Sequence, residues 1–297
     1  MRKIDYLFNC IRKHIKSEGF RCPNCGASGG AIVDRKYLVT SLRRCASCLL
    51  LYRTPTDSAD ENKIFYNEEY KQGLTTDIPN DDRINELISS QFVGSDVDYT
   101  QYINILSHIN PGKNCHLFEY GCSWGYGSWQ LSNAGFDVTA HEISRVRSQV
   151  AAEKLGVNTD DDPEALSLNA GHEKYDVFFS SHVLEHVPSP SSVVALAWDL
   201  LRDGGYFVSI TPNGSVDNRN VNPLWRKVWG RVHPNFIDDM FLDSKFSKSA
   251  RFFASSPFYN ENFLDIDSLT VKRNVVRDLK GNDLLLMARK NKAAGSF

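Results

Sequence analysis

The sequence predicts an α/β fold in which a doubly wound, mostly parallel sheet follows a small N-terminal ribbon. Three observations indicate this organisation. Short apolar runs alternate with amphipathic segments between residues 115 and 210, a glycine-punctuated turn lies within the first of these units, and two Cys-x-x-Cys pairs precede residue 50. A chain of 297 residues with 41% hydrophobic content can bury a core of this size together with a second, smaller unit.

The N-terminal segment has the spacing of an amphipathic helix. Its apolar residues recur on one face, among several lysines and arginines, and they are Ile4, Leu7, Phe8, Ile11 and Ile15. A helix of this kind can lie on a membrane surface. Amphipathic helices pack against their own protein more often, and we expect packing here.

Two Cys-x-x-Cys pairs follow, Cys22 with Cys25 and Cys45 with Cys48, and 19 residues separate them. Each pair can bring two thiolates to one metal ion, and the spacing is typical of a four-cysteine zinc ribbon. Two redox-active pairs are the alternative interpretation. Four thiolates fill the coordination of zinc and leave no open position for chemistry, so the predicted zinc is structural.

The charges of the chain exclude some partners. The net charge is −2, so the whole molecule has no strong attraction for nucleic acid. Residues 1–53 nevertheless carry 11 Lys/Arg and 3 Asp/Glu, whereas residues 54–100 carry 3 and 11.

No apolar run is long enough to cross a membrane, and no signal peptide is expected. Metal-type cysteine spacing is typical of a reducing compartment, so we expect a cytoplasmic protein.

The most informative stretch is Leu-Phe-Glu-Tyr-Gly-Cys-Ser-Trp-Gly-Tyr-Gly at residues 117–127. A short buried strand ends near Glu119, and Gly121 and Gly125 lie in the turn before the next helix. Glycines let backbone N–H groups approach a ligand without Cβ obstruction, although tight turns also use glycine for packing alone. A second strand ends at Glu142, about 20 residues on, where a doubly wound unit places a carboxylate on ribose hydroxyls.

Further strand–helix units follow in the same order. Ser144 can cap a helix that Gly156 ends, residues 175–180 form a buried strand, and an amphipathic helix from Ser191 precedes the strand 206–210. Repeated alternation with short turns predicts a parallel sheet covered on both faces.

These motifs resemble class I S-adenosylmethionine-dependent methyltransferases. The matching residues are Glu119-x-Gly121-x-x-x-Gly125, Glu142, Asp176 with His182-Val-Leu-Glu-His-Val, and Gly204-Gly205-Tyr206. Ser123 replaces the middle glycine of the usual loop. Dinucleotide enzymes prefer Gly-x-Gly-x-x-Gly, which the glycines at 121, 125 and 127 fit poorly. With its N-terminal zinc ribbon, the chain is similar to bacterial methyltransferases of sugar and polysaccharide biosynthesis.

The resemblance implies a Rossmann-like fold with an antiparallel C-terminal hairpin, formed by segments around residues 269–276 and 283–288. It divides the chain into an N-terminal helix and ribbon (1–53), a bridging segment (54–97), the methyltransferase domain with an insertion at about 211–245 (98–290), and a tail (291–297).

S-adenosylmethionine is the cofactor that this resemblance implies. Its expected contacts come from the first loop, the end of the second strand, the ends of the following strands and a tyrosine of the bridging segment. They are Glu119, Gly121, Cys122, Ser123, Gly125, Tyr126, Glu142, Ile143, Asp161, Ser180, Ser181 and Tyr70.

Three histidines are candidate catalytic residues. His182 follows the strand that ends near Ser180, at the sheet edge where ligands bind, and a histidine can act as a base near neutral pH. His186 lies one helical turn later, and in similar enzymes it braces the loop. His233 corresponds in position to the base of related sugar methyltransferases. The tyrosine and glutamate of their C-methylating branch are absent beside it, which leaves O-methylation more open.

The expected function is methyl transfer to a small-molecule or glycan acceptor, first of all a sugar hydroxyl or carbon in polysaccharide or nucleotide-sugar biosynthesis. A quinone-like or small aromatic acceptor is the alternative within the same class. A different class is an inactive, cofactor-binding interaction module, against which the intact loop and Glu142 argue. Trp225 and Trp229 of the insertion either stack on the acceptor or belong to the core.

Overall fold

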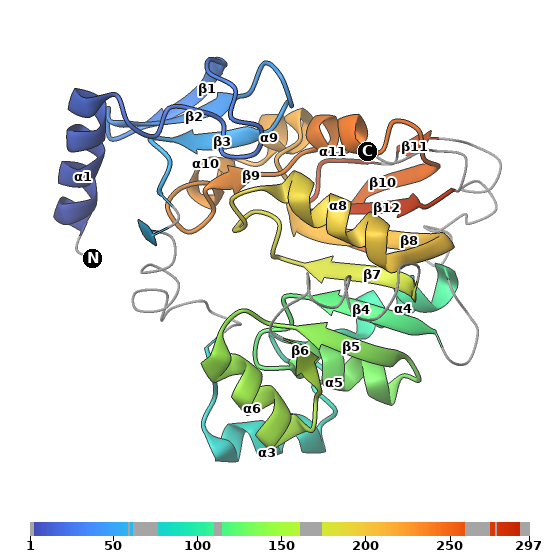
Figure 1. Cartoon of the computed structure of the whole chain (residues 1–297). Helices are drawn as coiled ribbons and strands as arrows, with labels where there is room; N and C mark the ends of the chain where they lie inside the picture. The colour runs from blue at the N-terminus through green and yellow to red at the C-terminus, as the bar shows by residue number, and fades with distance from the viewer. Residues whose placement is uncertain are drawn as a thin grey trace.

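The structure is a computed structural model that describes residues 3–58, 60–61, 77–109, 115–160, 174–258, 274–276 and 278–291. Its described strands form two sheets, an eight-stranded sheet in the order β11-β10-β12-β8-β7-β4-β5-β6 and a four-stranded sheet in the order β1-β2-β3-β9 (Figure 1).

The large sheet carries the α/β domain. Its strands are β4 (His116–Tyr120), β5 (Asp137–His141), β6 (Thr159–Asp160), β7 (Tyr175–Ser181), β8 (Leu201–Pro212), β10 (Arg251–Ser255), β11 (Asn274–Val276) and β12 (Asp283–Arg289). The helices around it are α3 (Asp81–Ser89), α4 (Thr100–Ile109), α5 (Tyr126–Asn133), α6 (Arg145–Leu155), α8 (Pro190–Leu200) and α11 (Asp239–Lys245).

The predicted mostly parallel sheet is confirmed. Strands β6, β5, β4, β7 and β8 run parallel, and β12 runs antiparallel to both β8 and β10. From β4 the chain first builds outward to β5 and β6 and then returns to add β7 and β8 on the other side. The gap between β4 and β7 is therefore a topological switch point, where open α/β sheets bind their ligands.

The C-terminal strands are antiparallel as expected, but the partner of β12 differs. It pairs with β10, a strand that was not predicted from the sequence, whereas β11 joins the outer edge of β10 in parallel. The apolar residues Phe252, Phe253 and Ala254 are all buried, because both faces of β10 are covered. Such a strand belongs inside the sheet, and the short β11 occupies the edge.

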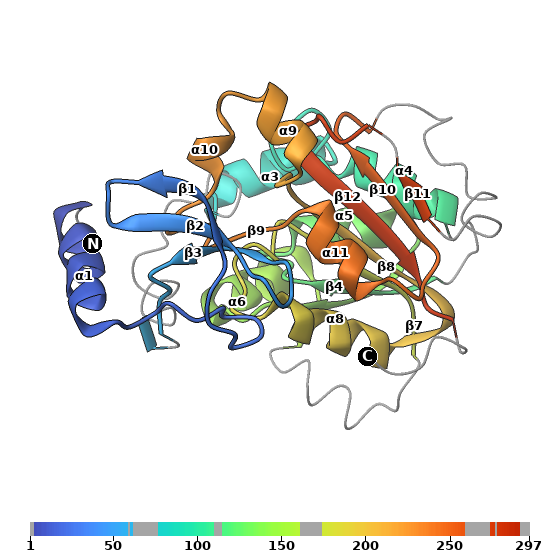
Figure 2. The same ribbon diagram turned by 90° about the horizontal axis from the view of Figure 1, so that it is seen from above.

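Alternating side chains fill two cores, one on each face of the sheet. On one face, Phe118, Phe178 and Phe207 stack in a row against α8 and α11. On the other, residues such as Phe179 pack against α4 (Figure 2). Because neighbouring residues of a strand point to opposite faces, a continuous apolar run is what a doubly covered sheet requires.

The small sheet contains the ribbon. Its strands are β1 (Ala31–Lys36), β2 (Thr40–Arg44), β3 (Leu51–Thr54) and β9 (Asn235–Phe236), and the flanking insertion adds α9 (Val216–Val221) and α10 (Trp225–Val228). Strand β9 belongs to the insertion of the large domain, so that the ribbon and the insertion share one sheet. Trp229 is buried beside Phe236, and Trp225 stacks on the same ring. Both tryptophans therefore serve the core, one of the two interpretations considered above.

Two helices outside the sheets, α3 and α1, make contacts that were not predicted from the sequence. Helix α3, within the bridging range, packs Ile84 and Leu87 against the large domain, and Lys154 of α6 reaches Asp81 at 2.9 Å. Helix α1 (Lys3–Lys16) leaves Ile4, Phe8, Ile11 and Ile15 exposed, with Leu7 half-buried, so the expected packing of this stripe is wrong. The polar face packs instead, because Lys13 pairs with Glu61 and Asp57.

Among the described residues, no helix has both the length and the apolar character needed to cross a bilayer.

Candidate active site

The loop after β4 has the backbone that a close approach to a ligand requires. Gly121 (φ +86°), Ser123 (φ +53°) and Gly125 (φ +87°) all adopt left-handed conformations. A Cβ at Gly121 would lie 2.5 Å from Val183 Cγ2, and one at Gly125 would lie 2.8 Å from Ala151 Cβ. Any other residue at these two positions would have a strained backbone and a Cβ that clashes with its neighbour, so both positions require glycine. Ser123 adopts the left-handed conformation that a glycine would adopt there.

Glu142 ties this loop to the loop after β5. Its two carboxylate oxygens accept the backbone N–H groups of Ser123 at 3.0 Å and of Ser144 at 2.7 Å, and the residue is buried. Each carboxylate oxygen has a further lone pair, so Glu142 can brace the loop and still accept ribose hydroxyls.

Glu119 is enclosed beneath the loop. Its carboxylate accepts hydrogen bonds from Tyr99 Oη at 3.3 Å and from Ser128 Oγ. Burial raises the pKa of Glu119 to about 7, although both hydroxyl groups oppose the shift. A Cβ at Gly127 would lie 2.3 Å from the Tyr99 ring, so this third glycine makes room for the network. Tyr99 and Ser128 were not predicted as site residues from the sequence. The glycine at position 127 was the one local sign that another part of the chain lies close to it.

Two buried hydroxyl groups at the switch point fit the presence of a bound ligand. Ser123 Oγ in the loop and Ser180 Oγ near the end of β7 have no hydrogen-bond partner among the described residues. Buried polar atoms are rarely left unpaired in native proteins. A polar ligand held between the ends of β4 and β7 would satisfy such atoms, which agrees with a nucleoside cofactor at this place.

The remaining expected cofactor contacts lie around this edge. Cys122 is buried in the loop, Tyr126 begins α5 with its ring against Tyr99, and Ile143 is exposed beside Glu142. Ser181 ends β7. Asp161 and Tyr70 lie outside the described residues.

His182 and Glu185 form a pair at the end of β7. His182 Nδ1 lies 3.6 Å from Glu185 Oε1, and His182 Nε2 lies 3.9 Å from Asp283 Oδ1. Desolvation lowers the pKa of His182, but Glu185 and then Asp283 outweigh it and raise this pKa. The His182 side chain remains 42% exposed, whereas Glu185 is buried. A buried carboxylate thus supports an accessible imidazole.

His186 and His233 come together beside the same carboxylate, with His186 Nε2 3.8 Å from Glu185 Oε1. Their rings meet edge to face with centroids 4.8 Å apart. The Nδ1 atoms lie 2.8 Å from the carbonyl oxygens of Val232 and Val228, respectively. A carbonyl oxygen only accepts hydrogen bonds, so each Nδ1 carries a proton. In the neutral ring, Nε2 is then the nitrogen that accepts.

The three histidines interact electrostatically with the Glu185 carboxylate. Burial alone would raise the pKa of this carboxyl group, but His182, His186 and His233 lower it to about 2. Burial lowers the pKa of His186. Ligand atoms of Glu185, His186 and His233 lie within 4.8 Å of one another, close enough to surround a cation. The structure therefore gathers all three histidines predicted from the sequence around one carboxylate that the sequence had not singled out.

The four cysteines of the ribbon converge on one point. Their Sγ atoms all lie within 4.8 Å of one another, with Cys22–Cys48 and Cys25–Cys45 distances of 3.6 Å. Tetrahedral zinc with Zn–S bonds of about 2.3 Å separates its sulfur ligands by about 3.8 Å. The donor set and its spacing fit a structural zinc ion. All seven cysteines lie in the described part of the chain and none forms a disulfide.

The ribbon is also connected to the histidine cluster. Strand β3 pairs with β9, and the Arg53 N–H donates to the Pro234 carbonyl at 2.8 Å. Asn235 of β9 donates its backbone N–H to the Glu185 carbonyl at 3.1 Å and its side-chain amide to the Val187 carbonyl. The segment that carries His233 is thus held between the ribbon and the loop that carries Glu185.

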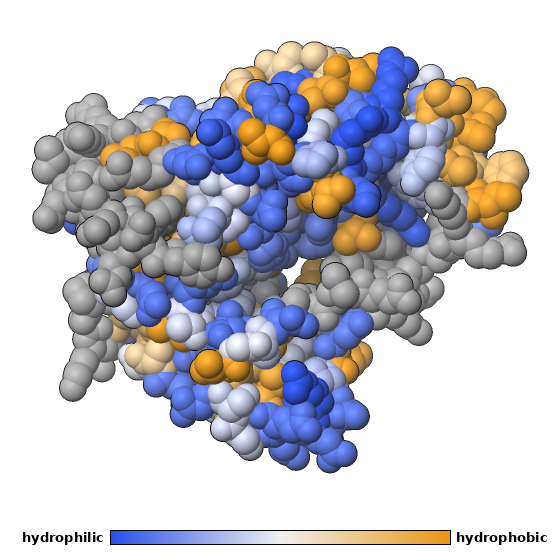
Figure 3. Space-filling model, turned by 180° about the vertical axis from the view of Figure 1, so that it is seen from behind, coloured by the Kyte–Doolittle hydropathy of each residue, from blue (hydrophilic) through white to orange (hydrophobic). Residues whose placement is uncertain are grey.

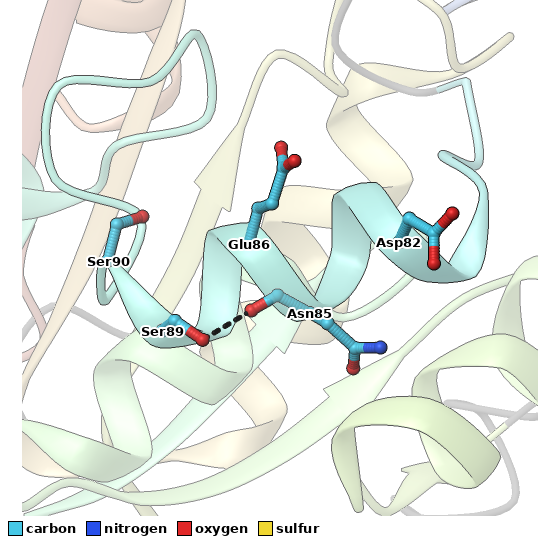
Figure 4. Close-up of a pocket in the computed structure, with 5 residues that line it drawn as sticks. All are labelled: Asp82, Asn85, Glu86, Ser89 and Ser90. Carbon is cyan, nitrogen blue, oxygen red and sulfur yellow. Dashed lines mark hydrogen bonds between the residues drawn. The ribbon is translucent and has the colours of Figure 1, made fainter.

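An open pocket elsewhere adds nothing to this site. It is lined by Asp82, Asn85, Glu86, Ser89 and Ser90. All five residues belong to α3 and its C-terminal end, with Ser89 Oγ donating to the Asn85 carbonyl (Figure 4). None of them lies on the loops that follow β4, β5 or β7.

Comparisons with known proteins agree with this geometry. The family model of a methyltransferase domain matches residues 97–247, just over half of the chain. A ubiquinone biosynthesis O-methyltransferase of Burkholderia pseudomallei (strain 1710b) is 27% identical over 156 residues, which cover 51% of this chain and 66% of the relative. Another, from Methylobacterium sp. (strain 4-46), is 34% identical over 110 residues, covering 36% and 44%. The match thus spans at most about two thirds of the length of these relatives.

A solved structure shows the same fold. The plantazolicin methyltransferase BpumL, in complex with S-adenosylhomocysteine (SAH), superposes with a TM-score of 0.50 at 12% identity, covering 78% of this chain and 94% of that one. The matched domain contains the loop after β4, Glu142 and the His182–Glu185 pair. The chain therefore belongs to the methyltransferase-domain family, as an enzyme with the class I, S-adenosylmethionine-dependent methyltransferase fold.

Proposed function

We propose that the protein transfers the methyl group of S-adenosylmethionine to a hydroxyl group of a small-molecule acceptor. The observation that carries the proposal is the switch point between β4 and β7. There, the loop after β4 contributes Gly121 and Gly125, and the loop after β5 contributes Glu142. The end of the neighbouring strand β7 contributes His182, which lies beside Glu185. The proposed nucleoside site and a basic imidazole thus lie at the same carboxyl edge of the sheet, where open α/β sheets bind their ligands.

The chain's own residues would hold the cofactor from two sides. Glu142 would accept the ribose hydroxyls, the N–H groups of the left-handed loop and the unpaired Ser123 hydroxyl would contact the polar groups, and exposed Ile143 would cover the base. When bound, S-adenosylmethionine supplies an electrophilic methyl group on a sulfonium. Tyr70 and Asp161 are proposed to complete the site from segments outside the described residues.

Deprotonation of the acceptor falls to His182 in this proposal. Glu185, whose Oε1 lies 3.6 Å from Nδ1, would favour the proton on Nδ1, so that Nε2 could take the acceptor proton as the methyl group transfers. The same carboxylate stabilises the imidazolium that results. His233 is the second candidate, but its Nδ1 faces the Val228 carbonyl and its ring packs on His186, which favours a role in positioning.

The acceptor that the comparisons favour is an aromatic hydroxyl. The relatives described above are named ubiquinone biosynthesis O-methyltransferases, which agrees with the quinone-like alternative and gives no support to polysaccharide biosynthesis. The sugar hydroxyl, first in the sequence-based ranking, takes second place. The Glu185-supported His182 keeps it a candidate, since an alcohol needs a base more than a phenol does.

A panel of acceptors with labelled S-adenosylmethionine separates these classes. We expect label in catechols or hydroquinone-like phenols at a higher kcat/KM than in nucleotide-linked sugars. Inclusion of a thiol and an amine acceptor in the panel controls for non-specific transfer. Transfer to sugars alone would restore the sugar assignment, and transfer to neither class would reject a hydroxyl acceptor.

The four-cysteine site is proposed to bind zinc as a structural ion. The reduced thiols needed for this site, and the absence of any disulfide among the seven cysteines, support a cytoplasmic setting.

A further inference from the structure

The N-terminal helix exposes large apolar side chains in a single row. On α1, Ile4 is 55% exposed, Phe8 64%, Ile11 42% and Ile15 80%. Their spacing of four, three and four residues places them on one face of the helix, which is about 21 Å long. Scattered exposed apolar residues are normal, but a continuous row of this kind marks an interaction surface.

This row cannot turn inward, because the opposite face of α1 is held by polar contacts. Lys13 is buried, bonds the Thr56 carbonyl at 2.8 Å and pairs with Glu61 at 2.6 Å. Buried Arg53 donates to Tyr6 Oη at 3.1 Å, and Cys10 is buried beside Thr40. The helix is thus fixed in an orientation that presents its apolar row to the surroundings.

The turn between β1 and β2 extends the same surface. Leu38 is 94% exposed and Tyr37 56%, and both occupy left-handed turn positions with φ of 63° and 53°. His14 of α1 contacts the Val39 carbonyl at 2.9 Å, which joins the turn to the helix. Figures 1 and 2 both show α1 beside the end of this hairpin, and Figure 3 shows a hydrophobic patch at the corresponding end of the molecule.

The charge around this apolar surface indicates which kind of partner binds to it. Residues 1–53 carry 11 Lys/Arg and 3 Asp/Glu, of which Lys13 and Arg53 are buried in ion pairs. Arg12 and Lys16 are exposed on α1, and Arg35 is exposed on β1, two residues before the turn. Of the acids, Asp5 lies on the same helix and Glu18 pairs with Arg12 at 3.5 Å. Two copies of a surface with a basic excess repel each other, and one short helix with a turn offers little area for a stable dimer. An anionic lipid surface attracts it.

We propose that α1 and the β1–β2 turn form a docking site for an anionic membrane surface, into which Phe8, Ile15 and Leu38 insert. Amphipathic helices of this type lie in the plane of the interface, with the apolar face about 5–10 Å deep and basic residues at the headgroups. Docking would bring the methyltransferase domain to acceptors that partition into lipid.

Co-sedimentation of the full chain with vesicles tests this. We expect binding to phosphatidylglycerol vesicles, little binding to phosphatidylcholine vesicles, and release as salt rises. The triple variant Phe8→Ser, Ile15→Ser and Leu38→Ser should weaken binding at least about tenfold, because each side chain loses apolar burial. These side chains are exposed, so the fold and the thermal midpoint should not change. The matched control is Val93→Ser with Val146→Ser, at 65% and 66% exposure elsewhere.

Two results would overturn the proposal. Equal sedimentation of the triple variant and the control pair would show that the row does not contact lipid. A dimer in light scattering that the triple variant dissociates, with no vesicle binding by the parent chain, would assign the surface to a second copy instead.

Discussion

Replacing His182 by alanine is expected to lower kcat about 10²–10⁴-fold, the usual contribution of a positioned general base. Cofactor affinity should change little, because the lost interaction belongs to proton transfer in the transition state. Single-turnover kinetics with saturating S-adenosylmethionine measures this directly. His108→Ala, an exposed histidine on α4, is the matched control and should retain full turnover.

The pH profile distinguishes a base from a merely structural residue. Neutral His182 is the active form, so the rate should rise with pH through the pKa of His182, which Glu185 and Asp283 hold above its ordinary value. Asp283→Asn removes one of these negative charges and should move the acid limb to lower pH. Full turnover in both His182→Ala and His233→Ala would reject the base and leave positioning alone to explain catalysis.

Replacing Cys45 by serine is expected to abolish zinc binding and unfold the ribbon. Metal binding and local folding are coupled, and structural zinc contributes about 10–16 kcal/mol in zinc-finger peptides. Metal analysis of the purified parent protein should give about one zinc per chain, and thermal unfolding of the variant should begin at a lower temperature. Turnover should also fall, because β9 links the ribbon to the Glu185 loop and to the segment of His233.

Cys115→Ser provides the control, since Cys115 directly precedes β4 and lies outside the four-cysteine group. It should retain its zinc. A Cys45→Ser protein with the zinc content and the thermal midpoint of the parent would contradict the assignment.

Much of the fold could be predicted from local pattern. Runs such as residues 177–179 are apolar on both faces because the sheet is covered on both faces, and the alternation of strands and helices can be predicted without knowledge of distant residues. The loop glycines could also be predicted locally, since a left-handed backbone favours glycine, and at Gly121 and Gly125 Val183 and Ala151 leave no room for a Cβ.

Other features depend on partners far away in the chain. Strand β9 contains only Asn235 and Phe236, too few residues for a periodic signal, and it exists because β3 provides its hydrogen bonds. Helix α1 faces its apolar row outward because Asp57 and Glu61, more than 40 residues later, hold Lys13. The enclosure of Glu119 by Tyr99 likewise joins residues that no local pattern connects.

The central claim, a nucleoside site at the switch point, is tested most directly by calorimetry with SAH. We expect one site that binds SAH and does not bind NAD. Glu142→Ala should weaken binding about 10–100-fold, since hydrogen bonds to a charged group contribute about 1.5–3 kcal/mol. Glu86→Ala, an exposed acid on α3, should bind as the parent does. Binding of NAD with no response to SAH, or equal SAH affinity in Glu142→Ala and Glu86→Ala, would contradict the assignment of this site.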